Sequence, residues 1–154
     1  MSGLFLEDLS LGQTAEMTRL VTQKDIDAFA AATGDYNPVH VDPDYAAGTV
    51  FKGPIAHGML AAGYISALFA SNFPGGIYGS QTLHFKRAIR PGDEVVIRAV
   101  ITAIDEQRAN VTLKTVCSVG RKSMVEGVAV VSVPRRTPAP SQRLAPVPPP
   151  AAAS

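Results

Sequence analysis

The sequence has little cysteine and lacks the long apolar runs of membrane and exported proteins. Cys117 is the only cysteine in 154 residues, which excludes an intrachain disulfide and any metal cluster held by several thiolates. Its place in the alternating run VTLKTVCSV favours a small buried strand residue over a nucleophile. No stretch of about 18 residues passes without a polar break, and the N-terminus MSGLFLEDLSLGQ has no basic region followed by a long apolar run. We therefore expect a cytoplasmic protein without membrane insertion.

Strong positive charge is also lacking once the C-terminal stretch is set apart. Residues 134–154 hold 7 of the 12 prolines and three of the 14 basic side chains, with few branched or aromatic residues to bury. The remaining 133 residues carry 11 basic and 13 acidic side chains, which excludes a polyanion binder such as a nucleic-acid-binding protein. With 46% apolar residues, residues 1–133 are predicted to form one domain and residues 134–154 a disordered Pro/Ala-rich tail.

Periodicity predicts two helices and five strands. A strand is expected near Gln13–Leu20, then a helix over Asp25–Thr33 with Thr22 as its N-cap, and one helical turn within DPDYAAG. The stretch from Ile55 to Phe69 is apolar on nearly every side, which is typical of a central buried helix. Four alternating runs follow, which we expect to form an antiparallel meander: IYGSQTLHFKRAI, EVVIRAVITAI, RANVTLKTVCSVG and SMVEGVAVVSV.

These elements predict an α+β fold in which a five-stranded antiparallel sheet wraps around one long central helix. The sheet must cover its apolar face, and the apolar helix is the obvious cover. One helix leaves sheet edges exposed, so we expect two copies to pair as a homodimer.

The stretch TGDYNPVHVD, residues 33–42, places a carboxylate and an imidazole on either side of an Asn-Pro corner. A continuous helix would hold Asp35 and His40 about 140° apart, but a turn forced by Pro38 can aim both side chains into one cavity. Such a pair can carry both proton transfers of an addition or an elimination. From these residues alone, a purely structural corner made of good turn formers is an equally open reading.

The dipeptide His57-Gly58 lies at the start of the apolar helix. Unpaired N–H groups and the positive end of the helix dipole favour a developing negative charge there, and glycine permits close approach of a ligand carbonyl. Together with an acid/base pair, this arrangement suits chemistry next to a thioester carbonyl, where enolate character develops. His57 itself is interpreted as a structural residue at the start of the helix.

Three motifs in this order resemble a known family. GDYNPVHVDPDYA, IAHGM and GSQTLHFKRAIRPGDEV are similar to those of the (R)-specific enoyl-CoA hydratases of the MaoC-like dehydratase family, over about Leu9 to Val133. The resemblance implies a hot-dog fold, a homodimer with one continuous sheet, and reversible addition of water to a trans-2-enoyl-CoA to give an (R)-3-hydroxyacyl-CoA. It implies no metal and no redox cofactor, because coenzyme A belongs to the substrate.

The resemblance also assigns roles by position. Asp35 and His40 match the catalytic acid/base dyad, and Gly58 matches the residue whose backbone N–H binds the thioester oxygen. Ser66 matches a serine near the dyad that supports it by hydrogen bonding, and Asn37 matches a motif position that shapes the loop. The side chains at the positions that set acyl-chain length in relatives do not indicate which chain length this protein prefers.

Several alternatives stay open from the sequence. The spacing of His40, Asp42, His57 and His84 fits no metal-ligand signature, and Ser66 lacks the G-x-S-x-G elbow of a serine hydrolase. The basic cluster formed by Lys86, Arg87 and Arg90 is either a solvated face or a contact for coenzyme A phosphates. His84 is predicted on the solvent or groove side of its strand. The same fold also carries thioesterases, acyl-binding subunits and dehydratases of carrier-protein-bound acyl groups.

Overall fold

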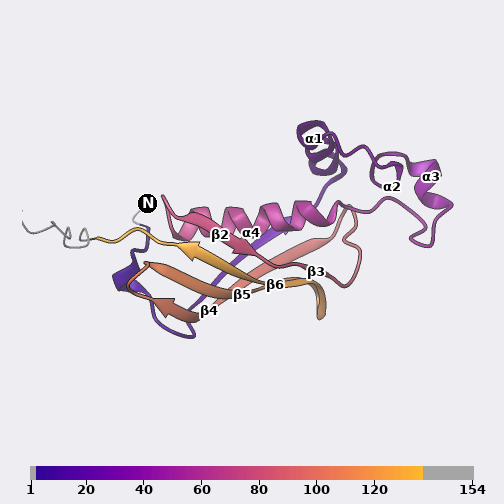
Figure 1. Ribbon diagram of the computed structural model, residues 1–154. Coiled ribbons are helices and arrows are strands. Elements are labelled where there is room, and N and C mark those ends of the chain that lie inside the picture. The colour runs from indigo at the N-terminus through magenta and orange to yellow at the C-terminus, as the bar shows by residue number, and fades with distance from the viewer. Residues whose placement is uncertain (1–2, 137–154) are drawn as a thin grey trace, which may run out of the picture.

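One antiparallel sheet forms the body of the protein, whose computed structural model describes residues 3–136. The sheet order is β1-β4-β5-β6-β2, and a two-residue strand β3 also pairs with β6 (Figure 1). The strands are β1 (Thr14–Leu20), β2 (Ile77–Gln81), β3 (His84–Phe85), β4 (Glu94–Asp105), β5 (Asn110–Val119) and β6 (Lys122–Ser132). The main path of the sheet therefore has the five strands expected from the sequence.

Two details of the strand prediction are wrong. The run IYGSQTLHFKRAI is not one strand but two, because the chain leaves the ladder after Gln81 and returns to it at His84. The meander contains only β4, β5 and β6. The broken run lies beside β6 rather than β4, since the central helix carries the chain to the edge of the sheet opposite β1.

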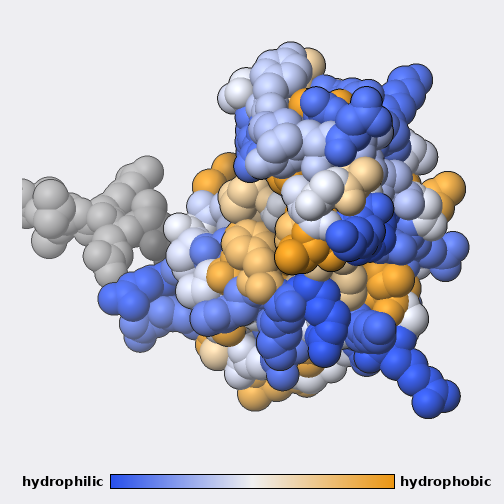
Figure 2. All heavy atoms as spheres, turned by 90° about the vertical axis from the view of Figure 1, so that its right-hand side faces the viewer, coloured by the Kyte–Doolittle hydropathy of each residue, from blue (hydrophilic) through white to orange (hydrophobic). Residues whose placement is uncertain are grey.

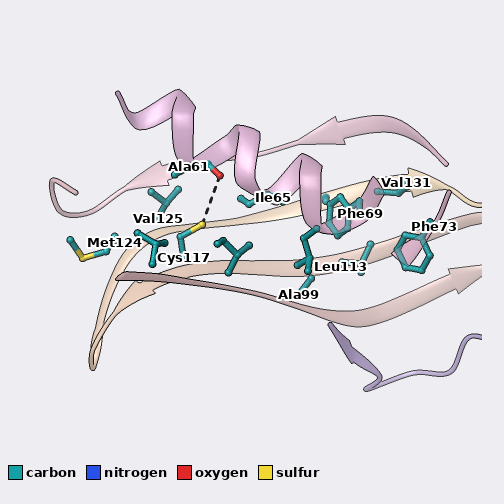
Figure 3. Close-up of a cluster of buried hydrophobic side chains, with 14 of the residues drawn as sticks. Ala61, Ile65, Phe69, Phe73, Ala99, Leu113, Cys117, Met124, Val125 and Val131 are labelled. Atoms are coloured by element: carbon teal, nitrogen blue, oxygen red, sulfur yellow. Dashed lines mark hydrogen bonds between the residues drawn. The ribbon is translucent and has the colours of Figure 1, made fainter. Parts of the chain in front are cut away.

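The central helix α4 (Gly58–Asn72) packs on one face of this sheet. Its side chains Ala61, Ile65 and Phe69 meet Leu113 and other residues of the strands in the core (Figure 3). The helix begins at Gly58, in the dipeptide predicted to lie at its start and three residues after the apolar stretch begins at Ile55. Its opposite face is exposed, although the residues there are small or apolar: Met59, Gly63, Ser66 and Ala70.

Cys117 lies in the core, as predicted. Its side chain is fully buried, with Sγ 4.0 Å from the carbonyl oxygen of Ala61. Burial raises the pKa of the Cys117 thiol to about 12, because the thiolate would lose its hydration. The thiol therefore stays protonated at neutral pH and is not a nucleophile.

Three short helices stand beyond one end of the sheet and carry the segment with Asp35 and His40: α1 (Gln23–Thr33), α2 (Pro38–Val41) and α3 (Pro43–Ala47). Helix α1 starts with the predicted capping box, in which Thr22 and Asp25 satisfy each other's backbone N–H groups. It ends at Gly34, whose φ of 81° is the left-handed conformation that glycine adopts readily. The expected turn within DPDYAAG is α3, whereas α2 was not predicted.

The two ends of the described chain are bonded to each other. The N–H of Leu6, in the short 3-10 helix η1 (Leu6–Asp8), donates to the carbonyl of Pro134, and the Arg136 guanidinium donates to Asp8. Pro134 and Arg136 of the expected tail thus contact the N-terminal segment, and residues 137–154 lie outside the described residues. Within residues 3–136, no helix has the length and apolar character needed to cross a bilayer.

Candidate active site

Side-chain hydrogen bonds shape the segment from Gly34 to Val39, which joins α1 to α2. Oδ1 of Asp35 accepts from the N–H of Asn37 at 3.2 Å, and Oδ1 of Asn37 accepts from the N–H of Val39 at 3.3 Å. The second bond makes Asn37 the N-cap of α2, and Pro38 occupies the first helical position, where its missing N–H costs nothing. Asn37 thus shapes the loop, the role expected of it, and its exposed side chain lies outside the cavity described below.

His40 lies on α2 and is 8% exposed. Its Nδ1 lies 2.7 Å from the carbonyl oxygen of Ile55, which can only accept, so Nδ1 carries the proton and donates it. In the neutral ring, Nε2 therefore has a free lone pair. The backbone carbonyl of His40 also accepts from Nε2 of Gln23, which ties α2 to α1.

His57 is the residue just before α4 and is 2% exposed. Its Nε2 donates to the backbone carbonyl of Asp35 at 2.9 Å. Its ring packs against that of His40, with centroids 3.9 Å apart and the planes tilted by 32°. Its ring also contacts that of Phe29 on α1, with centroids 4.7 Å apart. No residue of the described chain hydrogen bonds to its buried Nδ1.

Gly58 is the first residue of α4, so its N–H has no acceptor within the helix. It lines a cavity of about 340 Å³ together with His40, His57 and Phe85. A Cβ atom at position 58 would come 2.6 Å from Cε1 of Phe85, so only glycine fits beneath this ring. Viewed from the end of the sheet where α2 and α3 lie, apolar atoms gather between hydrophilic side chains above and below (Figure 2).

The structure brings the expected acid/base pair together. One nitrogen or carboxylate oxygen from each of Asp35, His40 and His57 lies within 4.8 Å of the others. His40 and Gly58 line the same cavity, whereas the carboxylate of Asp35 is exposed beside it. As predicted, no continuous helix joins the two residues: Asp35 lies in the segment between α1 and α2, and His40 lies on α2. His57 joins them from a segment 22 residues beyond Asp35.

The same three side chains are also the only group in the described residues placed to hold a cation. They differ from the set considered from the sequence: Asp42 instead caps α3 by accepting from Asp44 and Tyr45, and His84 is exposed on β3. The absence of a metal from the reaction stays a prediction.

Ser66 is not part of this group. It lies more than two helical turns along α4 from Gly58 and lines a second cavity of about 290 Å³ with Phe69, Phe73 and Tyr78. Burial raises the pKa of Tyr78 well above its ordinary value, and its hydroxyl donates to Gln81. Within one chain, Ser66 therefore contacts neither member of the dyad.

Two residues of the basic cluster, Lys86 and Arg87, line the first cavity, whereas Arg90 does not. Lys86 pairs with Glu126 at 2.9 Å and, with Ser123, holds the pKa of that carboxyl below its ordinary value. Arg87 donates to the carbonyl of Ser123. Both side chains are exposed and already partnered, which agrees with a solvated face and leaves a phosphate contact open.

Comparison with known proteins places this arrangement in a family. Residues 9–122 match the family described as "MaoC like domain". The chain is 43% identical over 134 residues to a protein named "(R)-specific enoyl-CoA hydratase" from Rhodospirillum rubrum, covering 86% of this chain and 93% of that protein. It is 38% identical to a "3-hydroxybutyryl-CoA dehydratase" from Methylorubrum extorquens, covering 86% of each. The chain therefore belongs to the MaoC-like family.

Solved structures agree with this assignment. The unliganded R-hydratase PhaJ1 from Pseudomonas aeruginosa superposes with a TM-score of 0.83 and 36% identity, covering 96% of this chain and 95% of that one. The (R)-hydratase from Aeromonas caviae gives a TM-score of 0.80 and 39% identity, covering 83% and 99%. The α+β hot-dog fold that the motifs implied is thereby confirmed.

Proposed function

We propose that this protein is an (R)-specific enoyl-CoA hydratase, which adds water reversibly to a trans-2-enoyl-CoA to give an (R)-3-hydroxyacyl-CoA. The observation that carries the proposal is the convergence of Asp35 and His40 beside the cavity lined by Gly58. The relatives named as hydratases and dehydratases support it, since both names describe one reversible reaction. A substrate made from coenzyme A also fits the expected cytoplasmic location, which stays a prediction.

The geometry suggests how the chain's own groups would act. The free lone pair on Nε2 of His40 and the carboxylate of Asp35 hold one water between them. The water oxygen adds to C3 of the enoyl group, one water proton passes to the pair, and the pair returns a proton to C2. Because the two groups are coupled, they act as a unit in both transfers.

Gly58 would stabilise the intermediate. As water adds at C3, negative charge moves onto the thioester oxygen, and the N–H at the start of α4 donates to that oxygen. The bond strengthens as the enolate forms, which lowers the barrier rather than merely binding the substrate. The lack of a Cβ lets the thioester approach this N–H closely.

We also infer that the working unit is a homodimer. The exposed face of α4 carries Met59, Gly63, Ser66 and Ala70, which a soluble monomer would leave uncovered. The edge strand β2 carries Ile77, which is 67% exposed. Pairing of two copies along β2 and α4 would cover both features. Ser66 lies on this face, so its supporting role is proposed only within the dimer.

Hydration of crotonyl-CoA tests the proposal. Purified protein should remove the absorbance of the conjugated thioester while releasing no free thiol. The product should be (R)-3-hydroxybutyryl-CoA by chiral analysis. Release of thiol with the double bond intact would show that the protein is a thioesterase and not a hydratase. Activity with the carrier-protein thioester but not with crotonyl-CoA would indicate a carrier-protein dehydratase instead.

Variants of the dyad test its role. Asp35→Asn keeps an oxygen that accepts from the N–H of Asn37, and His40→Asn keeps a donor near the Nδ1 that bonds Ile55. Each should fold normally and lose about 10²- to 10⁴-fold in kcat, because one of two cooperating proton-transfer groups is gone. Thermal melting checks folding. Near-normal turnover in either variant would refute the dyad.

A further inference from the structure

We propose that His57 is a positioning residue that fixes the spacing between Asp35 and His40 through its Nε2–H. The inference rests on the proposed hydratase function. His57 itself exchanges no proton with substrate in this account. It acts through the two dyad residues, each of which it contacts in a different way.

The first contact is the hydrogen bond to the loop that carries Asp35. Asp35 is exposed and lies in a segment held otherwise by local bonds to Thr33 and Asn37. The 2.9 Å bond from Nε2 of His57 to the Asp35 carbonyl is the long-range tie of this residue to the body of the protein. Without it, Asp35 would depend for its position on two local bonds of 3.2 Å, one from its own N–H to the Thr33 hydroxyl and one from the N–H of Asn37 to its carboxylate.

The second contact is between the His57 ring and the His40 ring. The His57 ring contacts both the Phe29 ring, with centroids 4.7 Å apart, and the His40 ring, with centroids 3.9 Å apart, so it restricts the position of the His40 imidazole. His40 is held on its edge by the carbonyl of Ile55. Residues 55–58 therefore supply the acceptor for His40, the donor for Asp35, and the N–H of Gly58.

The unpaired Nδ1 argues that His57 is more than packing. It is buried and has no hydrogen-bond partner among the described residues, an arrangement that native proteins generally avoid. At a site 2% exposed and in contact with other aromatic rings, phenylalanine would pack without bringing a buried, unpaired nitrogen of its own. A histidine with an unpaired Nδ1 is reasonable at position 57 if its Nε2 has a function, because functional sites are commonly less stable than they could be.

The test compares His57→Phe, which keeps a stacking ring but has no donor, with His57→Gln, which keeps an amide donor near the position of Nε2. His57→Phe should melt within a few degrees of the unsubstituted protein and lose about 10- to 100-fold in kcat, because small misplacements of reacting groups are costly. Its KM for crotonyl-CoA should change by less than about threefold, since a transition-state effect is lost. His57→Gln should recover most of the lost kcat.

Two results would overturn the inference. Unchanged kcat in His57→Phe would show that the donor is not needed. A loss of kcat in both variants that follows a loss of melting temperature would show that His57 only supports the fold. The expected split between kcat and KM, with rescue by the donor-bearing variant, is not produced by a merely structural residue.

A measurement independent of activity separates this inference from the proposed function. Imidazole ¹⁵N shifts should show that His57 carries its proton on Nε2 and that Nδ1 is bare. A proton on Nδ1 would overturn the inference whatever the enzyme does. If His57 carries its proton on Nε2 but the unsubstituted protein does not hydrate crotonyl-CoA, only the proposed function is contradicted.

Discussion

At the residue scale, the missing side chain of Gly58 decides the shape of the site. The ring of Phe85 covers Gly58 so closely that a methyl group there would overlap Cε1 and Cδ1. Phe85 is 54% exposed, so in Gly58→Ala the ring would move aside rather than unfold the protein. Because both residues line the cavity, the displaced ring and the new methyl group would disturb the place of the thioester.

We predict that Gly58→Ala loses at least about tenfold in kcat/KM for crotonyl-CoA with little change in melting temperature. The double variant Gly58→Ala/Phe85→Ala should recover part of this loss, because the overlap is relieved. Phe85→Ala alone is the control for loss of the ring. Full activity in Gly58→Ala would contradict the assigned place of the thioester oxygen.

Residues near in sequence were predicted better than residues that meet only in the fold. Asp35, His40 and Gly58 stood out because turn chemistry and a helix start are local features. The link between His57 and the Asp35 carbonyl spans 22 residues and depends on how α1 packs over the start of α4. No local pattern signals it. The distance of Ser66 from the dyad likewise follows from packing.

At the scale of elements, the sequence predicted those with long periodic patterns. Helices α1 and α4 and the strands β4, β5 and β6 were found near their expected bounds. Helix α2 was missed because four residues carry no periodicity, and it exists through the cap of Asn37 and the fixed φ of Pro38. The break between β2 and β3 depends on contacts with β6, including the bond from the N–H of Val128 to Thr82.

The capping box of α1 gives a prediction that depends on pH. Hydrogen bonds from the hydroxyl and the backbone N–H of Thr22 lower the pKa of Asp25 in the folded protein. A carboxyl with a lowered folded pKa stabilises the protein above its unfolded pKa, about 3.9, and this contribution is lost as pH falls through the folded value. Asp25→Asn should therefore be less stable at pH 7, and the difference should shrink toward pH 3.

Denaturant titrations at several pH values measure this difference. Thr22→Ala removes the other half of the box and should cost about 0.5–2 kcal/mol at pH 7. Asp27→Asn, on the same helix but outside the cap, is the matched control. An Asp25→Asn difference that grows as pH falls would contradict the assigned cap.

At the scale of the whole molecule, the exposed face of α4 is the surface on which we propose that two copies pair. Sedimentation velocity should give a mass near twice 16.2 kDa. Ala70→Glu places a charge on this face and should shift the equilibrium toward monomer, because burying an unpaired charge is costly. Gln107→Glu, in the turn between β4 and β5, adds the same charge elsewhere and should leave the mass unchanged. A monomer before any substitution would contradict the inferred assembly.

The central claim is that Asp35 and His40 deliver one water to C3 of an enoyl thioester whose oxygen is held by Gly58. A crystal structure of the slow Asp35→Asn variant with crotonyl-CoA tests it most directly. We predict the thioester oxygen at about 2.7–3.1 Å from the backbone nitrogen of Gly58, with C3 facing the side chains at positions 35 and 40. A thioester bound away from Gly58, or a C3 atom turned away from both side chains, would contradict the account.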